Sequence, residues 1–146
     1  MHIIKKKECH KGNLKIASSN LIFQNFGNLS LRINRKLFVI KPSGVNLKKT
    51  RYQDYPVISI NEEQNKNKLK PSVDTDFHLE IYKNFEHVNC IIHTHSKYAT
   101  IWAQACKSIP NLGTTHSDYW LKEIPITNIL SKKQIHSNYE KNIGKN

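Results

Sequence analysis

Short apolar runs alternate with polar stretches along this chain, and proline, glycine or polar residues bound the runs. This pattern is typical of β-strands. It predicts strands over Leu37–Ile40, Val57–Ile60 and Val88–Ile92, with a polar loop over Asn61–Lys70 between the second and the third. We expect these segments to contribute to one sheet that has helices packed against it.

Helical spacing of apolar residues predicts helices after the second and the third strand. Phe77 and Ile81 lie four residues apart, and Thr75 is placed to cap the helix that carries them. A second helix is expected from about Tyr98 to Cys106, with Trp102 in the core. Strands and helices therefore follow one another along the middle of the chain.

The last segment shows the signals of one more helix. Ser131 and Gln134 have the spacing of a capping box, Ile135 and Tyr139 are four residues apart, and Gly144 is placed as a stop. A chain of 146 residues with 38% hydrophobic content can bury one core. We predict a single α/β domain over residues 1–146, built from sheet and helix layers.

The formal charge of +12 and the isoelectric point near 9.7 raise the question of nucleic-acid binding. The basic residues come in small groups, such as Lys5–Lys7 and Lys48–Arg51, and they are interleaved with asparagine. No predicted helix carries a sustained basic face, so a solvated surface is the simpler explanation. We expect no nucleic-acid partner.

The N-terminus and the cysteines bear on the compartment. The start, Met1–Glu8, lacks the apolar stretch of a signal peptide, and no apolar run approaches the length that spans a bilayer. Cys9, Cys90 and Cys106 are an odd number without C-x-x-C spacing, which fits a reducing compartment. We therefore expect a cytoplasmic chain with no membrane partner. Cys90 is expected to pack in its strand, and a nucleophilic role for Cys90 or Cys106 stays open.

Two histidines at the end of the third predicted strand are candidate metal ligands. Side chains alternate along a strand, so His93 and His95 project to the same side. A divalent metal needs further ligands, and Asp74, ahead of a predicted helix, is the best upstream candidate. The alternative is a pair of strand-end histidines that are hydrogen-bonded to the backbone. The residues alone leave both interpretations open.

Two turns have the composition of anion-binding loops. Gly27–Ser30, which includes Asn28, and Lys41–Gly44, which includes Ser43, supply small residues, backbone N–H groups and hydroxyls. Lys41 adds a positive charge at the end of a strand. Phosphate is the expected guest, although Pro-Ser-Gly is also an ordinary turn.

Taken together, these motifs resemble the L-ribulose-5-phosphate 4-epimerases of the class II aldolase and adducin family. The residues that carry the resemblance, in order, are Gly27–Ser30, Phe38–Val45, Ser72–Thr75, His93–Ser96, Ala99–Ala105 and Gly113–Tyr119. The match runs from about Asn20 to the C-terminus. A long ordered series is far more specific than any single motif.

The resemblance implies a layered fold with a central, mainly antiparallel sheet flanked by helices, lacking its C-terminal part here. It also implies a zinc enzyme that breaks and remakes a carbon–carbon bond of a phosphorylated ketopentose, and a homotetramer with active sites between subunits. By position in the family pattern, the metal-site residues are Asp74, His93 and His95. Asp118 stands at the position of the acid/base residue, although a role in a turn or as a helix cap would also explain an aspartate there. The substrate-contacting residues are Gly27, Asn28, Ser43, Gly44, Ser72 and Val73, and Lys41 joins them as a phosphate ligand.

The chain also departs from the family pattern. Val73 stands where the family has a second serine, and Trp120–Glu123 replaces an aromatic residue and a glycine. The family's third zinc-binding histidine and a tyrosine from a neighbouring subunit lie beyond Asn146. Three hypotheses remain: an authentic shortened epimerase, a non-catalytic remnant of one, and an adducin-like binding module. Apolar surface left exposed by the missing segment makes aggregation an alternative to the expected oligomer. An amidohydrolase would need a barrel of roughly 250 residues, which this chain cannot supply.

Overall fold

The structure, a computed structural model, describes residues 2–22, 26–61 and 68–145. Its centre is a four-stranded antiparallel sheet in the order β3-β2-β1-β4. The strands are β1 (Asn28–Asn34), β2 (Leu37–Ile40), β3 (Val57–Ser59) and β4 (Cys90–His93). The three strands that the apolar runs predict are present, and β1 adds a fourth. Of the loop expected over Asn61–Lys70, residues 62–67 lie outside the described residues.

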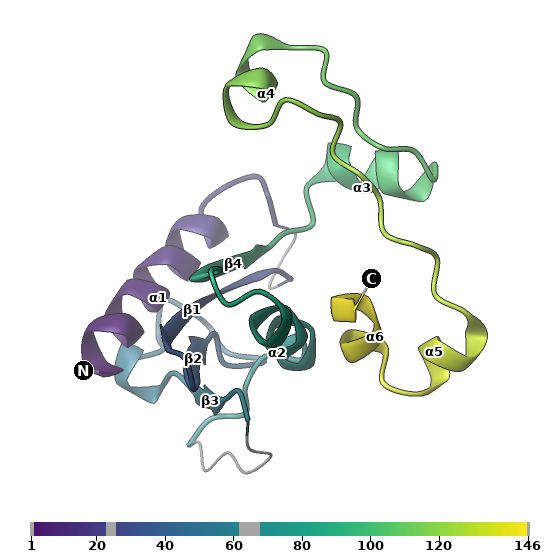
Figure 1. Cartoon of the computed structure of the whole chain (residues 1–146). Helices are drawn as coiled ribbons and strands as arrows, with labels where there is room; N and C mark the ends of the chain where they lie inside the picture. Colours follow the sequence, from purple (N-terminus) through teal and green to yellow (C-terminus); the bar gives the residue numbers. More distant parts are fainter. Residues whose placement is uncertain (1, 23–25, 62–67, 146) are drawn as a thin grey trace.

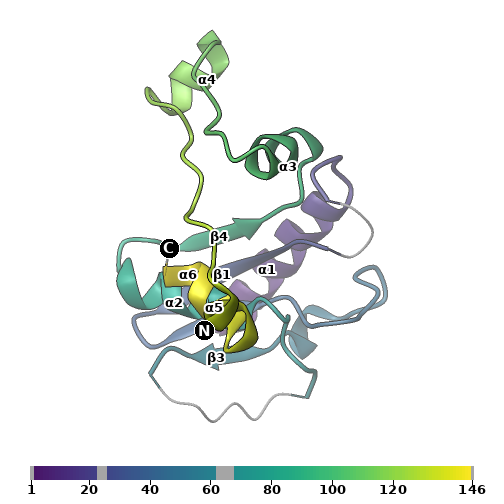
Figure 2. The same ribbon diagram turned by 90° about the vertical axis from the view of Figure 1, so that its right-hand side faces the viewer.

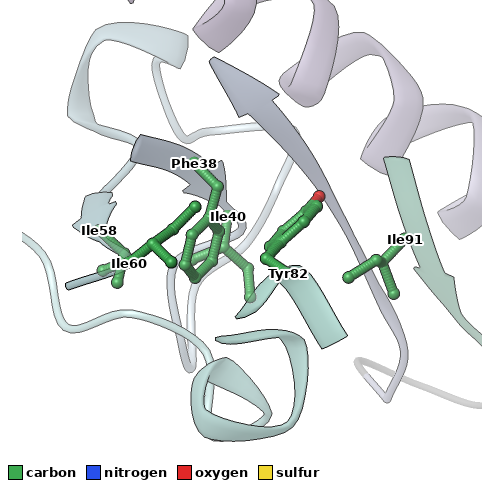
Figure 3. Close-up of a cluster of buried hydrophobic side chains, with 6 residues drawn as sticks. All are labelled: Phe38, Ile40, Ile58, Ile60, Tyr82 and Ile91. Atoms are coloured by element: carbon green, nitrogen blue, oxygen red, sulfur yellow. The ribbon is translucent and has the colours of Figure 1, made fainter. Parts of the chain in front are cut away.

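One helix covers each face of the sheet (Figures 1 and 2). α1 (His2–Ala17) packs on one face, where Cys9, Leu29 and Val39 belong to one buried cluster. α2 (Thr75–Asn84) packs on the other, where Tyr82 joins the cluster of Phe38, Ile40, Ile58, Ile60 and Ile91 that Figure 3 shows. Successive residues of β2 thus enter opposite clusters, as a pleated strand between two helices requires. The predicted layered α/β fold is confirmed.

After β4 the chain leaves the sheet and forms an extended arm, residues 97–129, which projects from the body in both views (Figures 1 and 2). It contains α3 (Lys97–Gln104) and α4 (Thr114–Tyr119). Trp102 is 36% exposed, so the expectation that it lies in the core is wrong. The reason is that α3 packs no residue into the body. Large apolar side chains of the arm are exposed, among them Tyr98, Leu112, Tyr119 and Leu121.

The C-terminal segment returns to the body as two short helices, α5 (Lys132–His136) and α6 (Tyr139–Lys145). The capping box of Ser131 and Gln134 is present as predicted. The single long helix is not, because Ser137 interrupts it; the Asn142 side chain donates to the Ser137 hydroxyl (3.0 Å) and to the Gln134 carbonyl (2.9 Å). Such local side-chain bonds compete with a continuous helix.

Two predicted helix boundaries also shift. The N-cap of α2 is Asp74, one residue before the predicted Thr75, whose hydroxyl instead donates to the Ser72 carbonyl at 2.5 Å. Gly144 lies inside α6 rather than ending it. Its role is close packing, because a Cβ at this position would come within 2.8 Å of the Phe77 carbonyl oxygen and of Glu80 Cβ. In the described part of the chain no helix is long and apolar enough to cross a membrane.

Gly144→Ala should therefore loosen the docking of α6 on α2. The added methyl group meets backbone and Cβ atoms that cannot move aside cheaply, and such overpacking typically costs about 1–3 kcal/mol. The loss should appear as faster amide hydrogen exchange across α6. Gly113→Ala is the matched control, since no atom lies within 4 Å of a Cβ there. Equal exchange rates in the two variants would contradict this packing role.

Candidate functional site

A cavity of about 530 Å³ opens where the start of β1, the end of β2 and the end of β4 meet the N-terminus of α2. α6 forms a further wall of the cavity. The residues that line the cavity are Phe26, Gly27, Asn28, Lys41, Ser43, Gly44, Ser72, Val73, Asp74, Phe77, His93, His95, Tyr139, Glu140 and Ile143. All the predicted metal and substrate residues line this one cavity. Segments that are far apart in sequence therefore converge on it.

The backbone at Gly27 requires glycine. Its φ is +95°, and a Cβ there would lie 2.9 Å from the His93 carbonyl oxygen. This close approach brings the start of β1 against the end of β4, where Asn28 pairs with His93 across the antiparallel ladder. Gly44, at the second predicted anion-binding turn, also has a positive φ of +63°. Both turns thus have glycine where the conformation disfavours other residues.

The second turn offers a ligand less backbone than its composition suggests. The Ser43 N–H donates to the Lys70 carbonyl at 2.8 Å, and the Ser72 N–H donates to the Lys41 carbonyl at 3.0 Å. The expectation of a free N–H at Ser43 is therefore wrong. These bonds join the end of β2 to the segment before α2. Anion binding at this wall would rest on side chains, in particular the hydroxyls and the Lys41 ammonium group.

Lys41 is only 6% exposed although it lines the cavity. Burial lowers the pKa of its ammonium group, and the charge of Asp74 opposes that shift. A buried cation of this kind gains from an anionic partner. Ser72 is also buried, whereas Val73 is 64% exposed at the cavity wall. The cavity therefore presents a shielded positive charge beside one apolar position.

Asp74 stands between Asn28 and His93. Asn28 Nδ2 donates to Asp74 Oδ2 and, at 3.2 Å, to the Ser72 hydroxyl. Asp74 Oδ2 lies 3.2 Å from His93 Nδ1. Burial raises the pKa of the Asp74 carboxyl, but the hydrogen bonds and charge of His93, with the amide of Asn28, outweigh it and lower the pKa overall. The group is therefore a carboxylate at neutral pH.

The two histidines are close enough to act together. The ring centroids of His93 and His95 are 4.8 Å apart. A carboxylate at Nδ1 of His93 is the arrangement that commonly orients a metal-binding histidine, with Nε2 left for the metal. The chemistry of the pair fits a borderline metal such as zinc. Among the described residues, however, no group of three or more His, Cys, Asp or Glu side chains is placed to hold a metal ion. The pair thus offers two imidazole groups, fewer donors than a zinc ion takes.

Asp118 does not join the cavity. It is an exposed residue of α4, in the arm, and the lining residues do not include it. Within one chain, the structure brings together the predicted metal and substrate residues but not the predicted acid/base residue.

Three residues of α6 line the cavity that the sequence analysis did not assign to it: Tyr139, Glu140 and Ile143. Tyr139 and Ile143 are spaced as one face of a helix, which is a signal for packing. The pattern does not say what the face packs against. The partner is α2, and the packing brings Glu140, a carboxylate, to the cavity wall.

Comparisons with known proteins agree with the fold and the motifs. Residues 8–146 match the family described as Class II Aldolase and Adducin N-terminal domain. A curated relative, the probable L-ribulose-5-phosphate 4-epimerase UlaF of Mycoplasma pneumoniae, is 44% identical over 141 residues. These cover 95% of this chain and 58% of that relative's length.

Solved structures show the same fold at lower identity. An L-fuculose 1-phosphate aldolase aligns with 97% of this chain and 67% of its own at a TM-score of 0.78 and 23% identity. The l-fuculose-1-phosphate aldolase of Thermus thermophilus aligns with 98% of this chain and 71% of its own at a TM-score of 0.76 and 17% identity. The resemblance seen in the sequence is confirmed, and the chain belongs to the class II aldolase and adducin family.

Proposed function

We propose that this chain forms the substrate pocket and part of the zinc site of an L-ribulose-5-phosphate 4-epimerase, which interconverts L-ribulose 5-phosphate and D-xylulose 5-phosphate. The observation that carries the proposal is the convergence of the phosphate-type residues and the histidine pair on one cavity. The 44% identity to the Mycoplasma pneumoniae relative named as a probable epimerase supports the reaction type.

The proposed chemistry breaks and remakes one carbon–carbon bond, as in a retro-aldol step followed by an aldol step. Lys41, Ser43 and Ser72 would hold the phosphate, because a cation and hydroxyls are suited to its oxygens. His93 and His95 would hold the zinc, and Asp74 would keep His93 in the binding orientation. Zinc would supply a Lewis acid that polarises the substrate carbonyl.

A proton must also move. The hydroxyl on the inverting carbon loses its proton as the bond breaks and regains one when the bond re-forms on the other face. Asp118 is the proposed group that takes and returns this proton. Since Asp118 lies on the arm outside its own cavity, we place it in the cavity of a neighbouring copy, which makes a homo-oligomer, a tetramer in the family, part of the proposal.

The cysteines bear on the cellular compartment of the chain. All three cysteines are free, and Cys90, which was expected to pack in its strand, is exposed, as is Cys106. Free exposed thiols suit a reducing environment. We therefore place the chain in the cytoplasm, with a phosphorylated ketopentose as its partner and neither nucleic acid nor membrane.

A second candidate is a sugar-phosphate-binding module without catalysis. One observation favours it: the described residues contain no three-ligand metal cluster. The phosphate-type wall with Lys41 and Ser72 does not depend on a metal, so a sugar phosphate could bind there without being converted.

The test is zinc content and conversion of L-ribulose 5-phosphate by the purified chain, beside His95→Ala. The proposal expects bound zinc and a conversion that the variant loses. Binding of the sugar phosphate without conversion, unchanged in His95→Ala, would favour the binding module. A folded chain with neither zinc nor binding would contradict both candidates.

Val73→Ser should strengthen binding of the phosphorylated sugar. The side chain is 64% exposed at the cavity wall, so the change should leave the fold intact and add one hydroxyl where the family has a serine. A hydrogen bond to a charged group contributes about 1.5–3 kcal/mol, so we expect a gain of roughly tenfold or more. Calorimetric titration with L-ribulose 5-phosphate measures the gain, and L-ribulose, which lacks the phosphate, is the control. A gain for both sugars would mean that the hydroxyl does not contact the phosphate.

A further inference from the structure

The interface between α2 and β1 carries a line of polar residues where an apolar contact is usual. Asp74, the N-cap of α2, is followed at every fourth residue by His78 and Tyr82 of the helix. On β1, Asn28, Ser30 and Arg32 follow one another at every second residue. Four helical residues rise about 6.0 Å and two strand residues about 6.7 Å, so the two lines keep nearly in step. We call these six residues the polar seam.

Contacts run along the whole polar seam. At one end Asn28 donates to Asp74. In the middle the Ser30 hydroxyl lies 2.7 Å from His78 Nδ1 and 2.8 Å from the Tyr82 hydroxyl. At the other end Arg32 Nη2 donates to the Tyr82 carbonyl at 2.8 Å. Each turn of α2 on this face is thus tied to the residue of β1 beneath it.

His78 is the centre of the seam, and its burial is hard to explain by stability alone. Its side chain is 0% exposed, and its Nε2 is buried without a hydrogen-bond partner in the described structure. Burial lowers the pKa of His78 to about 3, so the ring is neutral. An unpartnered buried polar atom costs about 1–3 kcal/mol, and an apolar residue of similar shape would avoid that cost. The histidine therefore has a use other than packing.

That use is visible at the cavity end of the seam. Asp74 is the N-cap of α2, and the His78 N–H closes the first turn on the Asp74 carbonyl at 3.1 Å. Asp74 Oδ2 lies 3.2 Å from His93 Nδ1, a charge contact that is not aligned as a hydrogen bond, since this nitrogen has no hydrogen-bond partner in the described structure. A shift of α2 along β1 by a fraction of a turn would move this carboxylate away from the imidazole. The register of α2 on β1 thus sets whether the Asp74 carboxylate lies beside His93 Nδ1.

We propose that His78 is a positioning residue: through Ser30 it fixes α2 on β1 and keeps the Asp74 carboxylate beside His93 Nδ1. The negative charge at this distance favours a proton on Nδ1 and leaves the Nε2 lone pair free. The use of that lone pair for zinc rests on the proposed function. The tautomer of His93 itself does not, because it is a property of the metal-free chain.

The experiment measures the His93 tautomer by ¹⁵N NMR of the metal-free chain and, separately, the dissociation constant for Zn²⁺. In His78→Phe we expect the Nδ1–H tautomer to lose its predominance and zinc binding to weaken by about 10–100-fold, the usual range for an outer residue of a metal site. His78→Asn, whose amide can reach Ser30, should restore both. A predominant Nδ1–H tautomer in both His78→Phe and Ser30→Ala would overturn the proposal.

A matched control separates positioning from stability. His10 on α1 is another histidine whose Nδ1 contacts a hydroxyl, that of Tyr55 at 3.1 Å, on the opposite face of the sheet. His10→Phe removes this contact at a partly buried histidine and should leave the His93 tautomer unchanged. If His10→Phe shifts the tautomer equally, the effect is general loosening and the proposal is wrong. If His78→Phe fails to fold, Ser30→Ala decides by the same tautomer measurement.

The positioning role of His78 and the proposed function can each fail without the other. Should the native chain bind no zinc while His78→Phe still shifts the tautomer, the positioning role stands and the proposed function fails. Should the native chain bind zinc while His78→Phe leaves both the His93 tautomer and the zinc dissociation constant unchanged, the proposed function stands and the positioning role fails.

Discussion

Replacing Arg32 by methionine should lower the free energy of unfolding by about 2–5 kcal/mol, because each buried carbonyl left without its donor costs about 1–3 kcal/mol. The guanidinium group is 9% exposed and donates to three carbonyls: Tyr82 at 2.8 Å, Phe85 at 3.0 Å and Val88 at 2.8 Å. These carbonyls end α2 and lead into β4. Methionine keeps the length of the side chain but leaves the Tyr82 and Val88 carbonyls without this donor, whereas the Phe85 carbonyl keeps the Val88 N–H at 3.2 Å. Urea denaturation followed by circular dichroism gives the loss.

Arg35→Met is the matched control, because Arg35 is an exposed residue in the turn between β1 and β2. Its unfolding free energy should stay within about 0.5 kcal/mol of the native value, as is usual for surface substitutions. Arg32→Lys should recover little, since an ammonium group cannot reproduce the planar fork of donors. A loss below about 1 kcal/mol in Arg32→Met would show that water replaces the guanidinium at these carbonyls.

The burial of Arg32 also explains why the pattern of apolar and polar residues did not predict β1 as a strand. Leu29, Leu31 and Ile33 alternate as strand residues should, but the intervening positions are polar, and a polar alternate face indicates solvent. In the structure that face is buried, because Asn28, Ser30 and Arg32 meet the polar residues of α2. By contrast, Leu37–Ile40 has no polar position, and its strand was predicted with the observed bounds.

α1 was missed for a related reason. Its buried residues include the polar Asn13, whose side chain donates to the Cys9 and Leu29 carbonyls, so no apolar stripe marks the inner face. Helix propensity and hydrophobic periodicity depend only on residues that are close together in the sequence. A buried polar side chain is satisfied by a partner many residues away, and that partner is known only when the fold is known.

For the site, the expectation that His93 and His95 lie together is confirmed, with ring centroids 4.8 Å apart, although β4 ends at His93 and His95 follows it outside the strand. The meeting of Asp74 with His93 Nδ1 depends on how α2 lies over the sheet, which no local pattern specifies. The same holds for Glu140, which α6 carries to the cavity. Short-range spacing thus predicts which neighbouring residues lie together, whereas tertiary packing decides which distant residues join them at the cavity.

Removal of either histidine should have the largest effect on metal binding. Zinc sites with a full ligand set have binding free energies of about 10–16 kcal/mol, so one ligand of four accounts for roughly 3 kcal/mol or more. We expect His93→Ala and His95→Ala each to weaken Zn²⁺ binding by more than about 100-fold. Competition with a chromophoric chelator measures the dissociation constants. His87→Ala, an exposed histidine ahead of β4, should bind zinc as the native chain does.

Asp74→Asn distinguishes a ligand from a residue that orients one. If the carboxylate only holds His93, its loss should weaken Zn²⁺ binding by about 10–100-fold, less than the loss of either histidine. If Asp74 binds the metal directly, Asp74→Asn should match the histidine variants. The position of Asp74 Oδ2 favours the smaller effect, since this oxygen already accepts a hydrogen bond from the Asn28 amide and lies 3.2 Å from His93 Nδ1. Equal affinities in His95→Ala and His87→Ala would instead remove the histidine pair from the metal site altogether.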